Sequence, residues 1–262
     1  MSWIDLEGAA NVRDVGGLPT IDGRATRSGV LLRADNLQGL SPSDVARLTG
    51  DLRVRTVVDL RTTGELQLEG EGPLRRTPVA HHHVPLIPEE EDEPLEAEVE
   101  RAVPHRPDRA GSTLTDMTGD YVGYVEDAPA NLARALRILA DPATGTVLVH
   151  CAAGKDRTGV VVALALSLAG VTRDAVVTDY VRSADRIDAV FARLTSSPTY
   201  GPSLAHVRAD DLRPEAASME RFLDHVDRAY GGPHGLAMTL GVDEETVARL
   251  SARLVGTSPR AR

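Results

Sequence analysis

Four short hydrophobic runs along the chain have the pattern of buried β-strands. They are rich in Val and Leu, and residues that favour turns flank each of them. Their short length favours strands over buried helices. The predicted strands are Gly29–Arg33, Val54–Leu60, His81–Leu86 and Thr146–His150.

Helical spacing of apolar residues fills most of the sequence between and after these runs. Ser41 is a predicted N-cap, because Pro42 follows it and Asp44 takes the third helical position. Thr158–Leu168 is apolar on almost every side, which is typical of a buried helix. Further helices are predicted at Ala130–Ala140, Asp174–Ser183, Pro214–Ala229 and Asp243–Leu254. Strands that alternate with helices, followed by a helical C-terminal portion, predict an α/β fold.

One stretch departs from this pattern, since Glu89 to Glu100 contains eight acidic residues and no basic one. Pro88 and Pro94 lie beside and inside it. Like charges repel and extend a chain, so we expect an acidic, mobile insertion over 87–118. A metal site is the alternative, but the spaced Asp and Asn ligands and the turn glycine of a calcium loop are missing.

Composition narrows the class of protein. A formal net charge of −10 argues against a nucleic-acid partner, although the acidic stretch supplies most of this charge. The longest apolar run, Val160–Val171, is interrupted by Ser167 and Gly170 and is shorter than the ~20 residues of a membrane span. The acidic N-terminus lacks the basic and apolar regions of a signal peptide. We therefore expect a cytoplasmic protein without stable membrane insertion, and leave open both export without a recognisable signal and the oligomeric state.

The rarest reactive residues lie together. The chain has one cysteine, Cys151, and one lysine, Lys155, beside 28 arginines. A single cysteine excludes an internal disulfide. A lysine placed at random would rarely fall beside it, so this segment is the first candidate for chemistry.

The segment from Thr146 to Gly159 has the pattern of a strand, a tight loop and the start of a helix. Five residues separate Cys151 from Arg157, and a loop of this length can turn its backbone N–H groups inward around an anion. The N-terminal end of the helix and the planar guanidinium of Arg157 both suit a phosphate group. The same positive setting favours the nucleophilic thiolate of Cys151. The predicted phosphate-binding residues are Ala152, Ala153, Gly154, Lys155, Asp156 and Arg157. A buried core cysteine, the alternative, leaves this string of residues unexplained.

The string His150-Cys151-x5-Arg157-Thr158 resembles the signature of the cysteine-dependent protein tyrosine phosphatase superfamily. Flanking motifs follow in the order found in its bacterial tyrosine/serine phosphatase group: Asn11–Gly17, Leu32–Asp35, Val58–Arg61 and, near the C-terminus, Gly241–Asp243. The resemblance covers nearly the whole chain and is weakest at 87–118 and 195–212.

This resemblance implies a central, mainly parallel sheet flanked by helices, in a single phosphatase domain over 1–262. It also implies that helices within 181–230 form a lid over the site, although ordinary packing of these helices is the alternative.

The resemblance further implies hydrolysis of phosphotyrosine proteins, and of phosphoserine or phosphothreonine proteins, without metal or cofactor. Cys151 would form a cysteinyl-phosphate, and Arg157 with the loop amides would stabilise the transferring group. Thr158 would hydrogen-bond the departing thiolate, and His150 would orient the loop. Three alternative classes fit the sequence less well. A rhodanese normally has one loop residue fewer, and a reductase needs resolving cysteines that this chain lacks. An inactive phosphate-binding module would lack Cys151 or Arg157.

Two residues are candidates for the general acid that protonates the leaving group. Asp156 lies inside the loop, and the resemblance to the bacterial group favours it. Asp120 lies 31 residues before Cys151, about where dual-specificity phosphatases keep their acid. Because Tyr121 follows it in a predicted helix, Asp120 could equally be a surface residue.

Lys155 leaves a second substrate class open. It adds a flexible charge beside the predicted phosphate site, as do the lysines of phosphoinositide phosphatases whose loop reads Cys-Lys-Ala-Gly-Lys. Ala152 replaces the first of those lysines here. Phosphoinositides are therefore the alternative substrate to phosphoproteins.

The remaining polar residues are predicted to support the loop. Asp59 and Arg61 end a predicted strand, where they could form an internal ion pair or reach the edge of the site. The same scaffold role is predicted for Asn11, Arg13, Asp14, Arg33 and Asp35. In a strand, His81 and His83 would share one face, but no nearby ligands complete a metal site.

Overall fold

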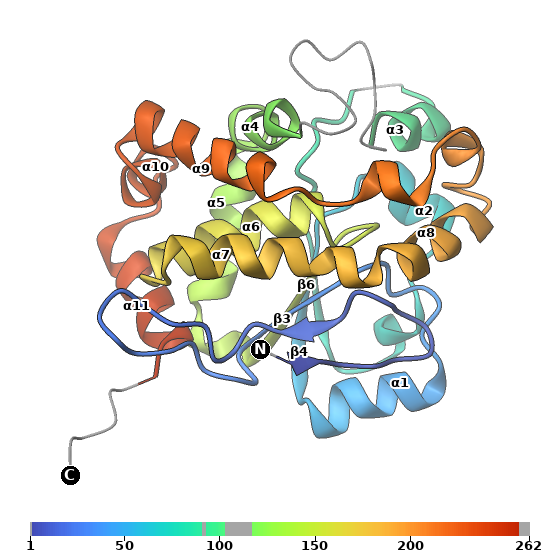
Figure 1. The fold of residues 1–262 in the computed structure, drawn as a ribbon. Coiled ribbons are helices and arrows are strands. Elements are labelled where there is room, and N and C mark those ends of the chain that lie inside the picture. The colour runs from blue at the N-terminus through green and yellow to red at the C-terminus, as the bar shows by residue number, and fades with distance from the viewer. Residues whose placement is uncertain (1, 91–92, 103–116, 257–262) are drawn as a thin grey trace.

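A six-stranded sheet lies at the centre of the computed structural model, which describes residues 2–90, 93–102 and 117–256 (Figure 1). Its strand order is β1-β2-β3-β6-β4-β5. The strands are β1 (Ser2–Trp3), β2 (Arg13–Asp14), β3 (Leu31–Ala34), β4 (Val54–Asp59), β5 (Ala80–His83) and β6 (Thr146–His150). β3, β6, β4 and β5 are parallel, whereas β1 and β2 pair antiparallel at one edge. The predicted mainly parallel sheet is confirmed.

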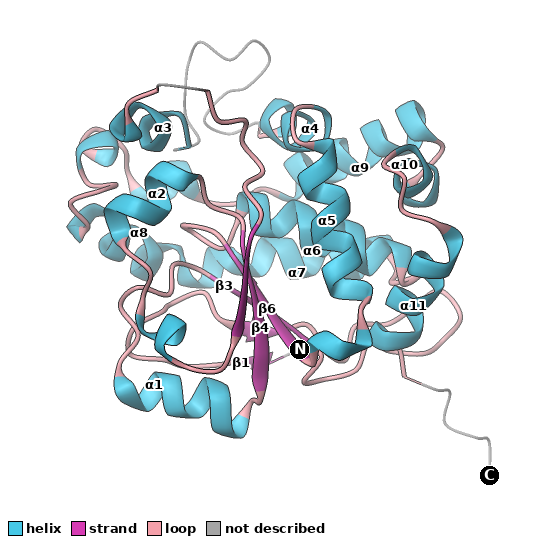
Figure 2. Ribbon diagram, turned by 180° about the vertical axis from the view of Figure 1, so that it is seen from behind, coloured by secondary structure: helices cyan, strands magenta, loops and turns pink. Residues whose placement is uncertain are grey.

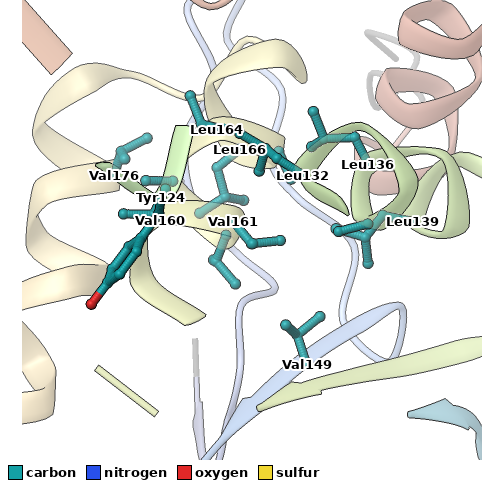
Figure 3. Packing of buried hydrophobic residues seen from close by; sticks show 14 of the residues in the cluster. Tyr124, Leu132, Leu136, Leu139, Val149, Val160, Val161, Leu164, Leu166 and Val176 are labelled. Carbon is teal, nitrogen blue, oxygen red and sulfur yellow. The ribbon is translucent and has the colours of Figure 1, made fainter. Parts of the chain in front are cut away.

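Helices cover both faces of the sheet. Side chains alternate along the strands, so each face carries apolar side chains that pack against helices. In β6, Val147 and Val149 enter the larger core, whereas Leu148 enters the smaller one on the opposite face. α5 (Pro129–Ala140) and α6 (Asp156–Leu168) supply much of the larger core, shown in Figure 3. The short α1 (Pro42–Ala46) and the π-helical turn Arg47–Asp51 cover the smaller core (Figure 2).

The other helices surround these two cores. They are α2 (Thr63–Glu69), α3 (Leu95–Ala102), α4 (Thr118–Glu126), α7 (Arg173–Val181), α8 (Ile187–Ser196), α9 (Ala216–Tyr230), α10 (Pro233–Thr239) and α11 (Glu244–Leu254). No helix of the described residues is long and apolar enough to cross a membrane.

Most predicted elements are present, with shifted ends. The predicted Ser41 cap forms, and Asp243 caps α11 at the start of the helix predicted over Asp243–Leu254. The strand predicted over His81–Leu86 stops at His83, because Pro85 has no N–H to continue the ladder. The sequence did not predict β1 and β2, since two residues are too few for a periodic pattern.

Part of the acidic stretch forms a helix. Residues 91–92 and 103–116 of the predicted insertion lie outside the described residues. Between them, α3 replaces the predicted loop and packs against α2. The buried Glu98 carboxylate accepts the N–H of Gly64 at 2.6 Å, and Glu89 accepts that of Thr63 at 2.5 Å. These two carboxylates therefore accept hydrogen bonds from the first N–H groups of α2, at the end of the helix that carries partial positive charge.

Candidate active site

The candidate site is the loop that joins β6 to α6. β6 ends at His150 and α6 begins at Asp156, two residues before the predicted start at Thr158. Arg157 therefore lies in the first turn of α6, and the loop lies at the carboxyl edge of the parallel strands. Ligands of open α/β sheets bind at this edge.

Groups outside the loop turn its carbonyls outward. The carbonyl of Ala152 accepts the Asn36 N–H at 2.9 Å, that of Ala153 accepts Asn11 Nδ2 at 3.0 Å, and that of Gly154 accepts Arg33 Nη2 at 2.8 Å. The N–H and carbonyl of a trans peptide point in opposite directions. Outward carbonyls therefore leave the loop N–H groups facing inward, as an anion site requires.

Gly154 makes this curl possible. Its φ of 66° lies in the left-handed region, and an added Cβ would come within 2.4 Å of the Ala34 carbonyl oxygen. Only glycine fits a loop that lies this close to β3.

Arg157 is held by a residue that the sequence analysis missed. Its Nη1 and Nη2 donate to the two carboxylate oxygens of the buried Glu65, at 2.5 Å and 2.8 Å. Nη1 also donates to the carbonyl of Leu60 at 3.3 Å. These contacts leave Nε and the second N–H of Nη2 for a ligand, which is the two-pronged edge that binds phosphate oxygens.

Glu65 has its place because of the start of α2. It occupies the third helical position, where its side chain accepts the Thr62 N–H at 2.8 Å in a capping box. Burial alone would raise the pKa of Glu65, but the charge and hydrogen bonds of Arg157 outweigh it and lower the pKa. Glu65 is therefore a carboxylate. The pattern Thr62-x-x-Glu65 was the signal in the sequence.

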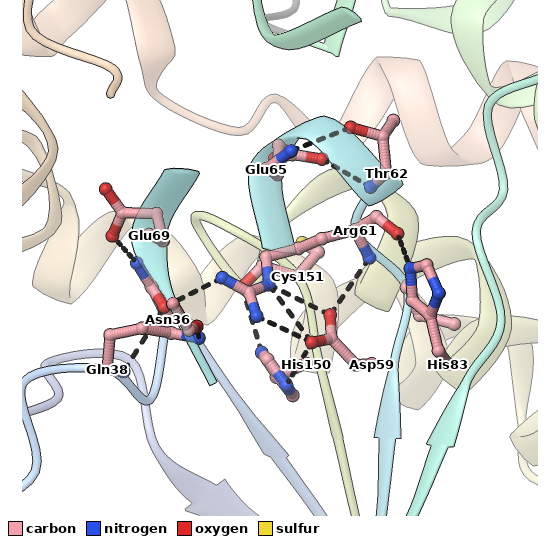
Figure 4. A network of polar contacts seen from close by, with 12 residues as sticks. Asn36, Gln38, Asp59, Arg61, Thr62, Glu65, Glu69, His83, His150 and Cys151 are labelled. Carbon is pink, nitrogen blue, oxygen red and sulfur yellow. Dashed lines mark hydrogen bonds and ion pairs between the residues drawn. The ribbon is translucent and has the colours of Figure 1, made fainter. Parts of the chain in front are cut away.

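His150 and Asp59 support the loop from behind (Figure 4). Asp59 accepts Nε and Nη2 of Arg61, so the predicted internal ion pair is present. His150 Nε2 lies 3.5 Å from Asp59 Oδ2, and its Nδ1 lies 3.3 Å from the Cys151 carbonyl oxygen. Burial lowers the pKa of His150 to about 4. His150 is therefore neutral near pH 7.

A second polar cluster surrounds Asp156. Its Oδ1 accepts the Lys155 ammonium at 2.5 Å and the Tyr121 hydroxyl at 2.7 Å. The Tyr121 hydroxyl also lies 2.6 Å from that of Tyr180. The structure thus brings Asp156 and Lys155 together beside Cys151. Asp120 lies in the first turn of α4 and is buried, so its interpretation as a surface residue is wrong.

The Thr158 hydroxyl is buried without a hydrogen-bond partner among the described residues. The hydrogen bond expected between it and the Cys151 sulfur is therefore not formed in this structure.

The predicted polar scaffold is present around the loop. Arg13 and Arg33 both bind the buried Asp179, at 2.9 Å and 2.5 Å. The Asp35 carboxylate accepts the N–H groups of Ala10 and Asn11. Asp14 accepts the N–H groups of Gly16 and Gly29, both at 2.7 Å.

The histidine run of β5 takes part in this scaffold. His83 Nε2 contacts the Arg61 carbonyl at 2.8 Å. Within 2–90, 93–102 and 117–256, no group of three or more His, Cys, Asp or Glu residues is placed to hold a metal ion.

Residues 187–212, here called the covering segment, close the site. They comprise α8 and the short 3₁₀ turns Pro202–Leu204 and Ala209–Leu212. Their apolar side chains pack against Ala152 of the loop. Only 2% of Cys151 is exposed, and it lines a cavity of about 30 Å³. A cavity of this volume has room for one or two water molecules but not for a phosphate group.

Comparison with known proteins agrees with this geometry. A model of the tyrosine phosphatase family matches residues 4–256. The chain is 31% identical to the triple specificity protein phosphatase PtpB of Mycobacterium tuberculosis, over 98% of this chain and 100% of that protein. It is 25% identical to a tyrosine-protein phosphatase of Nostoc commune, over 90% of this chain and 78% of that one.

Among solved structures, the core catalytic domain of the PP-IP phosphatase SIW14 from S. cerevisiae aligns with a TM-score of 0.37 and 16% identity, over 82% of this chain and 93% of that one. The family match and the full-length relative, together with the Cys151–Arg157 loop, identify a phosphatase of the cysteine-dependent class. The chain belongs to the tyrosine phosphatase family.

Proposed function

We propose that this phosphatase acts on phosphotyrosine proteins, and on phosphoserine and phosphothreonine proteins, through a phosphorylated Cys151. The observation that carries this proposal is the loop itself, whose carbonyls are anchored outward while Arg157 keeps a free N–H edge. Hydrolysis of p-nitrophenyl phosphate with EDTA present, inhibited by vanadate, tests the chemistry. Activity that needs an added metal would contradict it.

The reaction has two steps in this proposal. The Cys151 thiolate attacks phosphorus, the bond from phosphorus to the leaving oxygen breaks, and a carboxylic acid gives that oxygen a proton. Water then attacks the cysteinyl-phosphate, the S–P bond breaks, and the same carboxylate takes the proton of the water. Arg157 and the loop N–H groups stabilise the oxygens of the transferring group in both steps.

Asp156 is the proposed general acid, because it lines the cavity of Cys151, whereas Asp120 does not. We expect Asp156→Asn to lower kcat about 100-fold or more on phenyl phosphate, whose leaving group needs a proton. The loss should be much smaller on p-nitrophenyl phosphate, whose leaving group is stable without one. Steady-state kinetics on both substrates measure this difference.

Asp120→Asn is the matched control, since Asp120 is also a buried carboxylate in the first turn of a helix. We expect similar losses on the two substrates for this variant. If the leaving-group dependence followed Asp120 instead, the assignment of Asp156 would be wrong.

Lys155 supports phosphoinositides as the alternative substrate class. Its buried ammonium contacts Asp156 beside the phosphate site, where it adds a positive charge that a second phosphate could pair with. We expect Lys155→Ala to lose about tenfold more activity on an inositol polyphosphate than on a phosphotyrosine peptide. Lys155→Arg, which keeps the charge, is the control. Equal losses on both substrates would remove phosphoinositides from the proposal.

The covering segment is the proposed lid. The range of 181–230 predicted from the sequence narrows to 187–212 in this proposal, because α9 packs into the larger core through Met219, Phe222 and Val226. A phosphate group does not fit beneath the closed segment, so the segment moves when substrate binds.

The thiol chemistry also supports a reducing compartment such as the cytoplasm. Only a reduced Cys151 can act as nucleophile. The chain has no second cysteine to protect it as an internal disulfide.

A further inference from the structure

Helix α2 presents two carboxylates to the covering segment. Glu65 and Glu69 are four residues apart and therefore lie on one face of α2. The hydroxyl of Tyr200 donates to Glu65 Oε1 at 3.1 Å, and that of Ser197 donates to Glu69 Oε1. Tyr200 and Ser197 both belong to the covering segment, which lies beside α2 in Figure 1.

Tyr200 completes the hydrogen bonding of Glu65. A carboxylate offers about four acceptor directions. Four donors fill them: Nη1 and Nη2 of Arg157, the N–H of Thr62 and the hydroxyl of Tyr200. The first three donors come from the body of the domain, so Tyr200 is the donor that the covering segment adds.

The environment keeps Tyr200 a donor. Only 2% of this residue is exposed, and burial raises the pKa of its hydroxyl well above the ordinary value. A hydrogen bond to a buried carboxylate is stronger than one between neutral groups. The same carboxylate oxygen, Oε1, also accepts Nη2 of Arg157, the arginine that binds phosphate in the proposed function.

We propose that Tyr200 is a latch, whose bond to Glu65 holds the covering segment closed over Cys151 and ties closure to the residue that holds Arg157. Ser197 and Glu69 form a second bond of the same latch. Substrate can enter only after both hydroxyls leave α2, because the closed cavity has no room for phosphate. The latch rests on the proposed function of this site and of the covering segment as its lid.

Tyr200→Phe tests the latch, because it removes the hydroxyl and keeps the ring. We expect iodoacetamide to alkylate Cys151 about fivefold to tenfold faster in this variant, because the closed form loses a bond to a charged acceptor. We expect KM for p-nitrophenyl phosphate to fall severalfold while kcat stays unchanged. Ser197→Ala should likewise raise the alkylation rate of Cys151 and lower KM.

Tyr230→Phe is the control, because Tyr230 ends α9 and packs against the larger core, outside the covering segment. In this variant, Cys151 should be alkylated at the rate of the unsubstituted protein, and KM and kcat for p-nitrophenyl phosphate should be unchanged. Unchanged alkylation in Tyr200→Phe, or a loss of kcat at constant KM, would overturn the latch. Alkylation needs no turnover, so faster labelling in a protein that hydrolyses no phosphate ester would reject the proposed function and leave the latch standing.

Discussion

Replacing Cys151 with serine is expected to abolish hydrolysis of p-nitrophenyl phosphate, with kcat falling about 10⁴-fold or more. The serine hydroxyl is nearly the same size, so the loop and its outward carbonyl bonds remain. A hydroxyl is a much weaker nucleophile than a thiolate near pH 7, and no neighbouring base is assigned to activate it. Steady-state kinetics, with cysteinyl-phosphate trapped by acid quench, measure both the loss and its cause.

Two controls separate this loss from misfolding. The melting temperature of Cys151→Ser should stay within a few degrees of that of the unsubstituted protein, because a small buried side chain replaces another. The variant should also still bind vanadate, since Arg157 and the loop N–H groups are intact. Turnover that survives the substitution would exclude Cys151 as the nucleophile.

The loop between β6 and α6 was predictable because all of its parts are adjacent in the sequence. The strand, the cysteine, the glycine that the curl requires and the arginine lie within Thr146–Gly159. Local chemistry is then enough to predict the loop, since backbone N–H groups and one helix end make up most of the proposed phosphate site. The sheet was predictable for a similar reason, because each of its longer strands carries its own apolar run.

The support of Arg157 was not predictable in the same way. Glu65 lies 92 residues before Arg157, and Tyr200 lies 135 residues after Glu65. Their contacts depend on how α2 and the covering segment fold against the loop. A capping box at Thr62 and Glu65 is visible in the sequence, but it predicts only the start of a helix. Nothing local shows that the same carboxylate binds an arginine.

The acidic stretch shows the same limit. Its composition predicts a solvated loop when each charge is considered alone. In the structure, Glu89 and Glu98 bind the first N–H groups of α2, and α2 in turn carries Glu65. Two of the acidic residues therefore help to position the helix that carries Glu65. A count of charges in the sequence does not reveal this role.

Replacing Arg157 with lysine is expected to lower kcat/KM for p-nitrophenyl phosphate about 10³-fold, although the charge is kept. Arg157 donates from one edge to Glu65 and, in the proposed function, from the other edge to substrate. A lysine ammonium has no second planar edge. In the variant, Glu65 and the phosphate would compete for the same small cation. We therefore expect both a higher KM and a lower kcat in steady-state measurements.

Arg249→Lys is the matched control, because Arg249 pairs with Glu245 on the exposed surface of α11. That pair contributes little, so activity and stability should be unchanged. Arg157→Lys should also lower the melting temperature, since the buried Glu65 loses its two-bond partner. A variant that keeps its activity within tenfold would show that charge alone suffices at this position. The shared use of Arg157 by Glu65 and substrate would then not be the basis of phosphate binding.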